Sequence, residues 1–428
     1  MINFEKLSSP KRILLIEPPF YKLFGYKRYH YPISLTLVGA YLEELGHNVK
    51  IYDADKPTAE CKEYTRSEAG ENYYRYEEAV KNLNHPVWEE IKSAVIEYGP
   101  EIVGITGSIT AKIDSANLIA KFVKELYEDK VQVVLGGVHV GAMLSMYPDY
   151  DFGEHYDDIC AYIPDFISRK PNKRLIIDYD KYEPQNYFSI WTSVGCPNNC
   201  TFCTYSLNNK VTFRSIESVK SELYDLKNEY GRAFPVYFID DSFISYTKRF
   251  YEISSIVKSL GMKFKAGGRV MDLSLEKIDK FIENGGEHIY IGVESGSQRI
   301  LDLIKKRLTV EEAVKRTKWL NEAGLEWSAF FIAGFPFETI DDLKMTEELI
   351  HKIKPTFVSL NRFAPYPGTQ IYKDHYLNSN IRFMDMFQLN NKNYTQLDDK
   401  VMNYIEKMFK WADEYNKEKK NEISLKSD

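Results

Sequence analysis

The sequence predicts an α/β protein built from two successive parallel-sheet regions. From Arg12 to about Arg169, short apolar runs alternate with amphipathic helical segments, and a second alternation begins after a Pro-rich, charged stretch at 170–185. The chain has 428 residues, of which 44% are hydrophobic and 28% charged. This length is enough for two or three domains, each with its own core.

The first alternation predicts a doubly wound, Rossmann-like domain over residues 1–170, with helices on both faces of a parallel sheet. Leu35, Val38, Leu42 and Leu45 share one helical face, and Gly46 is a plausible helix stop. The polar, Tyr- and Glu-rich stretch between Asp55 and His85 is expected to be a long loop or extra helix rather than core. The segments of this domain, in order, are RILLIEPPF, SLTLVGAYLEELG, NVKIYDAD, VWEEIKSAVIEYG, EIVGITG, SANLIAKFVKELY and VQVVLGG.

The second alternation predicts a partial (β/α)6 TIM-like barrel over residues 186–375, followed by a helical extension over 376–428. Thr309 and Glu312 are placed to form a capping box at the start of one helix. In such a barrel the functional groups lie at the carboxyl ends of the strands. The six predicted strands are FSIWTSV, PVYFID, MKFKAGG, HIYIGV, WSAFFIAG and TFVSLNR.

Charge and hydropathy limit the partners and the location. The formal net charge of -6 gives no bulk attraction to nucleic acid or to an anionic membrane, which favours a small-molecule, lipid or peptide substrate over nucleic acid. No apolar run approaches the roughly 20 residues of a transmembrane segment, and MINFEKLSSPKRILL does not read as a cleavable leader. A cytoplasmic location is therefore expected.

Three of the five cysteines are concentrated in GCPNNCTFC, directly after the first strand of the predicted barrel. Cys196, Cys200 and Cys203 have the spacing C-x3-C-x2-C, which suits three ligands of a four-iron cluster whose fourth iron stays open. A zinc knuckle is the alternative, but a closed zinc site needs a fourth ligand, and Cys61 and Cys160 belong to the other region. Three unrelated buried cysteines are a third reading.

At these residues the sequence resembles the radical S-adenosylmethionine (SAM) superfamily, in which an aromatic residue, here Phe202, precedes the last cysteine. The resemblance implies a [4Fe-4S] cluster on Cys196, Cys200 and Cys203, with SAM on the open iron. One electron, from a donor such as flavodoxin or ferredoxin, would cleave SAM and release a 5′-deoxyadenosyl radical. A barrel interior would shield that radical from water.

Further strand ends resemble SAM-contacting segments of the same superfamily. YFIDDSF and IGVESGS each end a predicted strand, and Arg269 in GGRVMD could neutralise the SAM carboxylate. A helix cap and ordinary ion pairs are the alternative roles for these polar residues, while GFPFET and APYPGT are expected to be turns at the barrel mouth. The expected SAM contacts are Phe202, Asp240, Asp241, Arg269, Gly292, Glu294 and Ser295.

The region before the barrel resembles the cobalamin-binding domain of class B radical SAM enzymes. Its glycines could allow close approach of the macrocycle and its nucleotide tail. Thr106, Ser108 and Thr110 could donate hydroxyl groups to the cofactor, although these residues could equally cap turns. No D-x-H-x-x-G sequence is present, so no histidine is expected to ligate the cobalt from below. Residues in PPFYKLFGYKRYHYP could cover a corrin face, although ordinary aromatic packing is expected for most of them. The expected cobalamin contacts are Thr106, Ser108, Thr110, Gly136, Gly137 and His139.

Three functions are compatible with these features. The first is a cobalamin-dependent methylase that acts on an unactivated carbon and draws on a second SAM to remethylate the corrinoid. The second is a cobalamin radical SAM enzyme that performs ring contraction, cyclisation, epimerisation or carbon–carbon coupling. The third is a non-catalytic sensor. A methylthiotransferase is disfavoured because the N-terminal half holds only Cys61 and Cys160, not a second cysteine trio.

Overall fold

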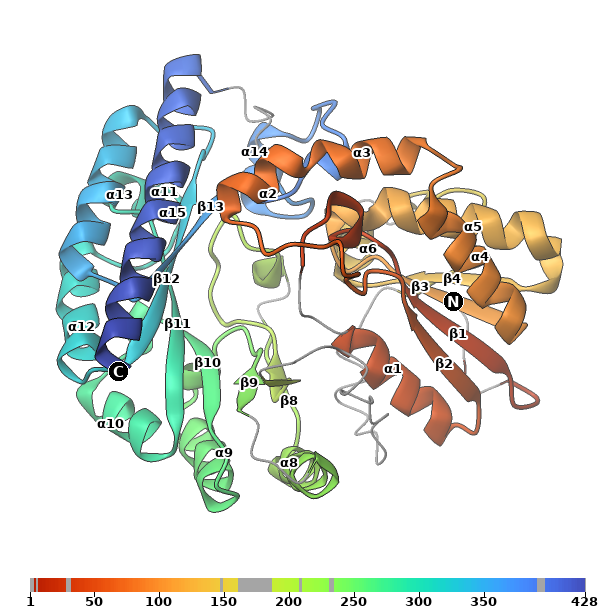
Figure 1. Ribbon diagram of the computed structural model, residues 1–428, viewed down its shortest axis with the longest axis horizontal. Helices are drawn as coiled ribbons and strands as arrows, with labels where there is room; N and C mark the ends of the chain where they lie inside the picture. The colour runs from red at the N-terminus through yellow and green to blue at the C-terminus, as the bar shows by residue number, and fades with distance from the viewer. Residues whose placement is uncertain are drawn as a thin grey trace. The chain divides into compact units, whose positions relative to one another are not determined.

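The computed structural model (Figure 1) describes Phe4 and residues 7–27, 32–146, 149–160, 187–207, 210–230, 235–390 and 397–427. The chain forms two compact units. Unit 1 comprises Met1–Gln185, Pro365–Gly368 and Tyr372–Asn390, and unit 2 comprises Asn186–Ala364, Thr369–Ile371 and Asn391–Asp428. The domain boundaries 1–170, 186–375 and 376–428 stay predictions. The expected transition at 170–185 lies outside the described residues, and so does Tyr29.

Unit 1 contains a five-stranded sheet whose described pairings are all parallel. The strand order is β2-β1-β3-β4-β5, so the chain direction across the sheet reverses between β1 and β3. Ligands of open parallel sheets bind near such a switch point, at the carboxyl ends of the strands. The strands are β1 (Arg12–Glu17), β2 (Asn48–Asp53), β3 (Ile102–Thr106), β4 (Gln132–Gly136) and β5 (Asp158–Cys160).

Helices follow the strands of unit 1 as the alternation predicts. The core beneath the first helix combines Leu35 and Leu42 with Ile13, Leu15 and Ile102 of the sheet. Burying these branched side chains between helix and sheet stabilises the domain by about 25 cal/mol per Å² of apolar surface. The helices are α1 (Ile33–Glu44), α2 (Arg66–Asn72), α3 (Tyr74–Lys81), α4 (Pro86–Tyr98), α5 (Ile113–Tyr127) and α6 (Val138–Met146).

The stretch between Asp55 and His85 corrects one expectation. It forms α2 and α3, but its Tyr73 and Tyr76 are 1% and 0% exposed, so it contributes to the core rather than lying outside it. Both rings pack on Phe20, at 6.0 and 4.7 Å between centroids. The expected aromatic packing of PPFYKLFGY is confirmed, because Phe20 also contacts Phe24 at 5.6 Å.

Unit 2 contains a six-stranded parallel sheet in the order β13-β12-β11-β10-β9-β6. Each strand pairs with its sequence neighbours, as in a (β/α) barrel that does not close. All six predicted strands are present. They are β6 (Phe188–Ile190), β9 (Val236–Phe238), β10 (Phe264–Arg269), β11 (Gly286–Glu294), β12 (Glu326–Ala333) and β13 (Phe357–Arg362), and a small antiparallel pair joins β7 (Ser193–Val194) to β8 (Thr212–Phe213).

Helices connect these strands. The Thr309 hydroxyl accepts from the Glu312 backbone N–H at 3.1 Å, but the Glu312 carboxylate pairs with Arg316 at 2.6 Å, so only half of the predicted capping box forms there. A complete box occurs instead at Thr339 and Asp342. The helices are α8 (Ile216–Tyr230), α9 (Thr247–Ser259), α10 (Leu275–Glu283), α11 (Gln298–Leu303), α12 (Val310–Glu322), α13 (Ile340–Ile353) and α14 (Gln370–His375).

The predicted C-terminal helical extension is present as α15 (Asp399–Ser427), which packs on α13 and on the edge strand β13 (Figure 1). The Asn416 side chain accepts from the Val358 N–H at 2.7 Å and donates to the Val358 carbonyl at 2.9 Å. One amide side chain thus occupies both backbone groups that a further strand would use.

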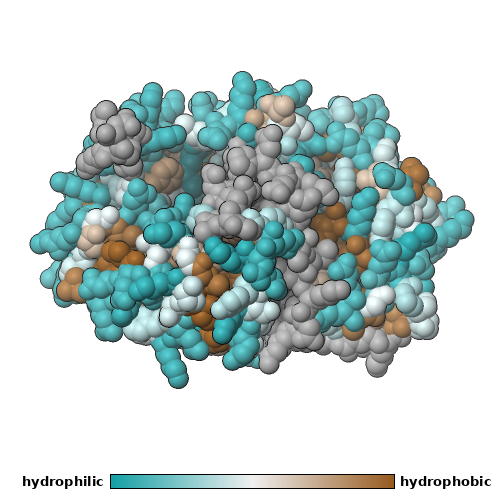
Figure 2. Space-filling view, turned by 60° about the horizontal axis from the view of Figure 1, so that its bottom comes forward, coloured by the Kyte–Doolittle hydropathy of each residue, from teal (hydrophilic) through white to brown (hydrophobic). Residues whose placement is uncertain are grey.

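Figure 2 shows a face on which hydrophilic side chains dominate and hydrophobic ones form small separate groups. Among the described residues, no helix is both long and apolar enough to cross a membrane.

Candidate cofactor-binding sites

The cysteine loop of unit 2 is anchored by two acids that follow β9. Asp240 accepts from the Thr192 N–H and hydroxyl at 2.7 and 2.6 Å and from the Ser193 hydroxyl at 2.5 Å. Asp241 accepts from the Gly195 N–H at 2.7 Å, immediately before Cys196. Burial raises the pKa of Asp241 to about 7 and also raises that of Asp240. Through these hydrogen bonds, both acids hold the backbone that leads into the cysteine loop.

Gly195 is required by its conformation and its surroundings. Its φ is +100°, and a Cβ would lie 2.1 Å from the Lys210 carbonyl oxygen. Only glycine combines this φ with such close backbone approach. The loop therefore leaves β7 in a direction that another residue could not adopt.

The three thiols of the cysteine loop form no disulfide among the described residues, and they differ in exposure. Cys200 is buried, whereas Cys196 and Cys203 are partly exposed. Burial, with smaller contributions from the neighbouring Cys200 and Cys196, raises the pKa of Cys203 to about 12, so the three sulfurs influence one another. In the described part of the chain, no three His, Cys, Asp or Glu are arranged to hold a single metal ion.

A buried ion pair lies near Cys200. Lys306 Nζ is 2.6 Å from Glu294 Oε1, and the two side chains are 8% and 9% exposed. Burial raises the pKa of Cys200, while the charges of Lys306 and Arg269 oppose this. Arg269 donates to the Lys306 carbonyl at 3.3 Å, and its own Nε is buried with no hydrogen-bond partner. A carboxylate ligand could therefore engage Arg269 or Lys306, and an amino group could engage Glu294.

Strained backbone accompanies this pair. Glu294, Lys305 and Arg307 have φ values of +76°, +53° and +53°, in the region that non-glycine residues rarely adopt. Gly292 makes room for the ion pair, because a Cβ there would lie 2.6 Å from Glu294 Oε1 and 2.9 Å from Lys306 Nζ.

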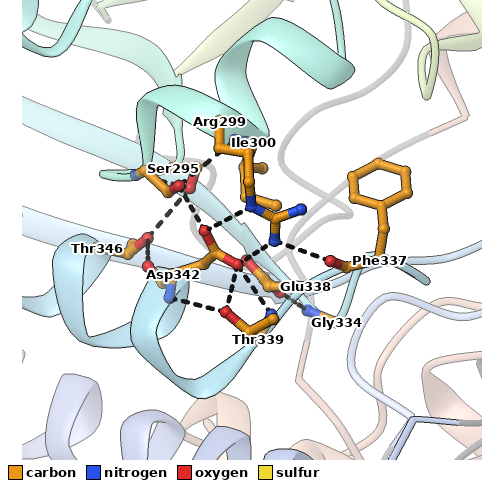
Figure 3. Close-up of polar contacts among 10 residues, drawn as sticks. Ser295, Arg299, Ile300, Gly334, Phe337, Glu338, Thr339, Asp342 and Thr346 are labelled. Atoms are coloured by element: carbon orange, nitrogen blue, oxygen red, sulfur yellow. Dashed lines mark hydrogen bonds and ion pairs between the residues drawn. The ribbon is translucent and has the colours of Figure 1, made fainter.

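A polar network joins the turns that follow β11 and β12 (Figure 3). Asp342 accepts from Ser297 at 2.6 Å, from Arg299 and from the Thr339 hydroxyl at 2.6 Å. Ser295 is fully buried, and its hydroxyl lies 3.2 Å from that of Thr346. In this structure the Ser295 hydroxyl therefore contacts another side chain of the network.

Glu338 belongs to the same network and carries a perturbed carboxyl group. One oxygen accepts from the Gly334 N–H, while the other is buried without a hydrogen-bond partner. Burial raises its pKa to about 8. In the same turn, Phe335 packs on Phe202 of the cysteine loop at 5.9 Å in a T-shaped arrangement.

Unit 1 contains an apolar cleft between α1 and the sheet. Its lining residues come from α1 and from the strands β1, β3 and β4. Its lining suits a flat apolar group such as the nucleotide base of a cobalamin tail. The lining residues are Phe4, Ile13, Leu15, Ser34, Leu35, Val38, Leu42, Ile102, Gly104, Ile105, Thr106, Val134, Gly136 and Gly137.

Glycine shapes this cleft. Gly137 has a φ of +128°, and a Cβ there would lie 2.7 Å from the Gly107 carbonyl carbon, so only glycine fits. A Cβ at Gly104 would lie 2.7 Å from Leu15 Cδ2 and would narrow the cleft.

The other expected cobalamin contacts do not line the cleft. His139 is 2% exposed, its Nδ1 lies 3.1 Å from the Thr110 hydroxyl, and its ring packs against Phe383 at 4.9 Å. Burial lowers its pKa to about 4, so the ring is neutral at pH 7. Ser108 is partly exposed.

A buried ionic group was not anticipated from the sequence. Lys112 is 3% exposed and pairs with Glu17, at the end of β1, and with Asp55 at 3.1 Å. Asp55 also accepts from the backbone N–H groups of Phe20 and Lys22, at 2.6 and 3.0 Å. This group fixes the loop after β1 at the carboxyl edge of the sheet.

The structure thus brings Thr106, Gly136 and Gly137 together in one cleft, and Glu294, Gly292 and Arg269 together near Cys200. Sequence reasoning missed Lys306, Lys112 and Gly104. Residue type gave no signal for Lys306, because Lys305, Lys306 and Arg307 resemble an exposed run of charge. The individual SAM and cobalamin contacts stay predictions.

Comparison with known proteins agrees with this arrangement. Residues 191–350 match the Radical SAM superfamily, and residues 25–162 match the B12 binding domain. An uncharacterized methyltransferase of Pyrococcus horikoshii is 29% identical over 73% of this chain and 76% of its own. Cytidylyl-2-hydroxyethylphosphonate methyltransferase of Streptomyces wedmorensis is 23% identical over 85% of this chain and 81% of its own.

Among solved structures, the radical SAM methyltransferase TsrM from Kitasatospora setae, with tryptophan and a SAM analogue bound, has a TM-score of 0.60. Its sequence identity is 14%, and the match covers 84% of this chain and 75% of TsrM. This likeness concerns the fold. The chain carries a B12-binding domain followed by a radical SAM domain, and these domain types imply a [4Fe-4S] cluster, SAM and cobalamin as its cofactors.

Proposed function

We propose that this cobalamin-dependent radical SAM enzyme methylates an unactivated carbon of its substrate. The observation that carries the proposal is the presence in one chain of a cysteine loop beside the Lys306–Glu294 pair and of a glycine-lined apolar cleft in the B12-binding domain. Relatives that match most of the chain are named methyltransferases, which supports methyl transfer over other radical chemistry.

The residues of unit 2 have separable roles in this proposal. Cys196, Cys200 and Cys203 hold the cluster, and Asp240 and Asp241 position the loop through backbone hydrogen bonds. Arg269, Lys306 and Glu294 supply opposite charges for the carboxylate and amino group of SAM. When bound, the cluster and SAM supply a hydrogen-abstracting radical, and cobalamin supplies the methyl group.

The residues of unit 1 bind and orient the corrinoid. The cleft beneath α1 receives the nucleotide tail, and Gly136 and Gly137 let it approach the sheet. His139 Nδ1 lies 3.1 Å from the Thr110 hydroxyl, whereas its Nε2 is buried without a hydrogen-bond partner, and the proposal assigns no cobalt ligand to this ring.

The test does not require the substrate. Anaerobically reconstituted enzyme with a low-potential chemical reductant and SAM deuterated in its methyl group should produce 5′-deoxyadenosine and label the corrinoid methyl group. Mass spectrometry measures both products. 5′-Deoxyadenosine without labelled corrinoid would favour the alternative, a cobalamin radical SAM enzyme that rearranges, cyclises, epimerises or couples its substrate. No SAM cleavage at all would leave only a binding or sensing role.

A further inference from the structure

The two faces of the unit 2 sheet can be told apart in β10. Side chains along a strand alternate between the faces of its sheet. Phe264 contacts the ring of Phe281 in α10 at 4.7 Å, and both Phe264 and Ala266 are fully buried, so these positions face the helices. Gly267 and Arg269 therefore belong to the opposite, inner face of the sheet.

Strand β11 shows the same alternation. Ile289, Ile291 and Val293 are at most 1% exposed, whereas Tyr290 between them is partly exposed. Gly267 pairs with Tyr290 in the β10–β11 register, so both residues lie on the inner face. The interior of a closed (β/α) barrel is a packed core of branched side chains. Here the corresponding face is partly open to solvent at an aromatic residue.

Three aromatic side chains from separate strands meet in unit 2, and we call them the aromatic row: Tyr237 of β9, Tyr290 of β11 and Phe330 of β12. The ring centroids of Tyr237 and Tyr290 are 5.1 Å apart, and those of Tyr290 and Phe330 are 6.1 Å apart. All three side chains are partly exposed, so part of each ring stays accessible.

Glycine leaves room beside the aromatic row. Strand β10 lies between β9 and β11, so the two tyrosine rings approach each other across β10. At this level β10 contributes Gly267, where a Cβ would meet no atom closer than 3.8 Å. The row is therefore not covered by a side chain of β10 at this position.

The aromatic row adjoins the charged groups near Cys200. Inner positions of a strand repeat about every 7 Å. The inner position after Tyr290 is Gly292, and the Lys306–Glu294 pair occupies the space over it. A group that packs on the row therefore lies next to the charges that the proposed function assigns to SAM.

We propose that the aromatic row is the substrate-binding face and that the substrate carries a planar aromatic ring, which lies over Gly267 against Tyr237 and Tyr290. Aromatic rings prefer offset-stacked and edge-to-face neighbours, and the tilted rings of the row offer both faces and edges. A substrate with only an alkyl chain would lack these contacts. The inference rests on the proposed function and adds the class of substrate to it.

The experiment measures binding without turnover. Enzyme reconstituted with cluster, cobalamin and SAM is dialysed anaerobically, without reductant, against 2-naphthol or decahydro-2-naphthol, and mass spectrometry gives the bound amounts. The two probes share a carbon skeleton and a hydroxyl group, so an apolar surface without aromatic recognition would bind the saturated probe at least as well. We expect wild type to bind 2-naphthol at least about fivefold more tightly.

Matched variants locate the preference on the row. Tyr290→Leu removes the ring and Gly267→Leu fills the space beside it, so both should lose the fivefold preference. Tyr290→Phe keeps the ring and should retain it. Tyr224→Leu is the control, because Tyr224 is a 40% exposed tyrosine of α8 in the same unit. SAM binding and iron content, measured on the same samples, should be unchanged in all four variants.

Equal binding of the two probes by wild type, or no binding of either, would overturn the aromatic-substrate inference. A preference that persists in both Tyr290→Leu and Gly267→Leu would also overturn it, because the ring would then bind elsewhere. If Gly267→Leu does not fold, the contrast between Tyr290→Phe and Tyr290→Leu decides. Absence of SAM cleavage after addition of a reductant would instead refute the proposed function.

Discussion

Lys306 Nζ lies 2.6 Å from Glu294 Oε1, and both side chains are more than nine-tenths buried. Glu294 ends β11, and Lys306 lies in the loop after α11. Each charge offsets part of the desolvation free energy of burying the other. The pair therefore links the stability of the barrel to the charges available to a ligand near Cys200.

Removing one partner should destabilise the protein more than removing both. Lys306→Met leaves a buried carboxylate and should cost about 3–5 kcal/mol, whereas Glu294→Gln/Lys306→Met should restore most of that loss. Chemical denaturation of the cofactor-free protein measures both. Both variants should bind SAM more weakly, as equilibrium dialysis with the reconstituted protein would detect. Equal stabilities of the single and double variants would contradict the buried pair.

Each cluster cysteine should be individually necessary. Cys196→Ala, Cys200→Ala and Cys203→Ala should each lose the brown iron–sulfur absorption and SAM cleavage, because two thiolates cannot hold the cube in place of three. Cys61→Ala is the matched control, since Cys61 is also a free buried cysteine but lies in unit 1. Full SAM cleavage by any of the three loop variants would remove that residue from the ligand set.

Filling the cleft of unit 1 should release the corrinoid and spare the cluster. Val38→Trp places an indole in the space between α1 and the sheet, and corrinoid retained after reconstitution should fall at least about tenfold. Ile96→Trp, at a position that is 56% exposed, should retain it. Corrin absorbance and iron content are measured on the same samples. Undiminished corrinoid in Val38→Trp would show that the tail binds elsewhere.

Glu338 should make stability fall as the pH rises. Burial raises its pKa from 4.5 to about 8, so between these values the folded protein keeps a proton that the unfolded chain releases. Its contribution is therefore complete below pH 4.5 and decreases by up to about 1.4 kcal/mol per pH unit until about pH 8. Glu338→Gln should remove this part of the slope. Denaturation of both cofactor-free proteins from pH 5 to 8 measures the difference, and parallel curves would contradict it.

The fold could be predicted because its signals are local. Apolar runs between amphipathic helices indicate parallel strands wherever they occur, and the three cysteines proposed as ligands lie within eight residues of one another. The burial of a side chain by residues that are distant in the sequence could not be predicted in this way. Tyr73 and Tyr76 lie in a polar stretch, and only the packing of α3 against the loop after β1 turns them into core.

Lys306 escaped prediction for a related reason. Lys305, Lys306 and Arg307 resemble an exposed run of charge, and the alternating backbone conformation that buries only the middle residue is not encoded by residue type. Similarly, two adjacent acids indicate a ligand site or a cap equally well. The structure shows that Asp240 and Asp241 accept hydrogen bonds from backbone groups ahead of Cys196. The sequence does not reveal these contacts, because the partners are far apart along the chain.

The attachment of α15 through Asn416 has a practical consequence for shortened versions of this protein. A chain cut before Asp399 would leave the Val358 amide and carbonyl without their side-chain partner along an outermost strand of apolar character. An edge strand exposed in this way can pair with a strand of another molecule. Truncated preparations should therefore aggregate even though every cysteine and charged group near the cluster is still encoded.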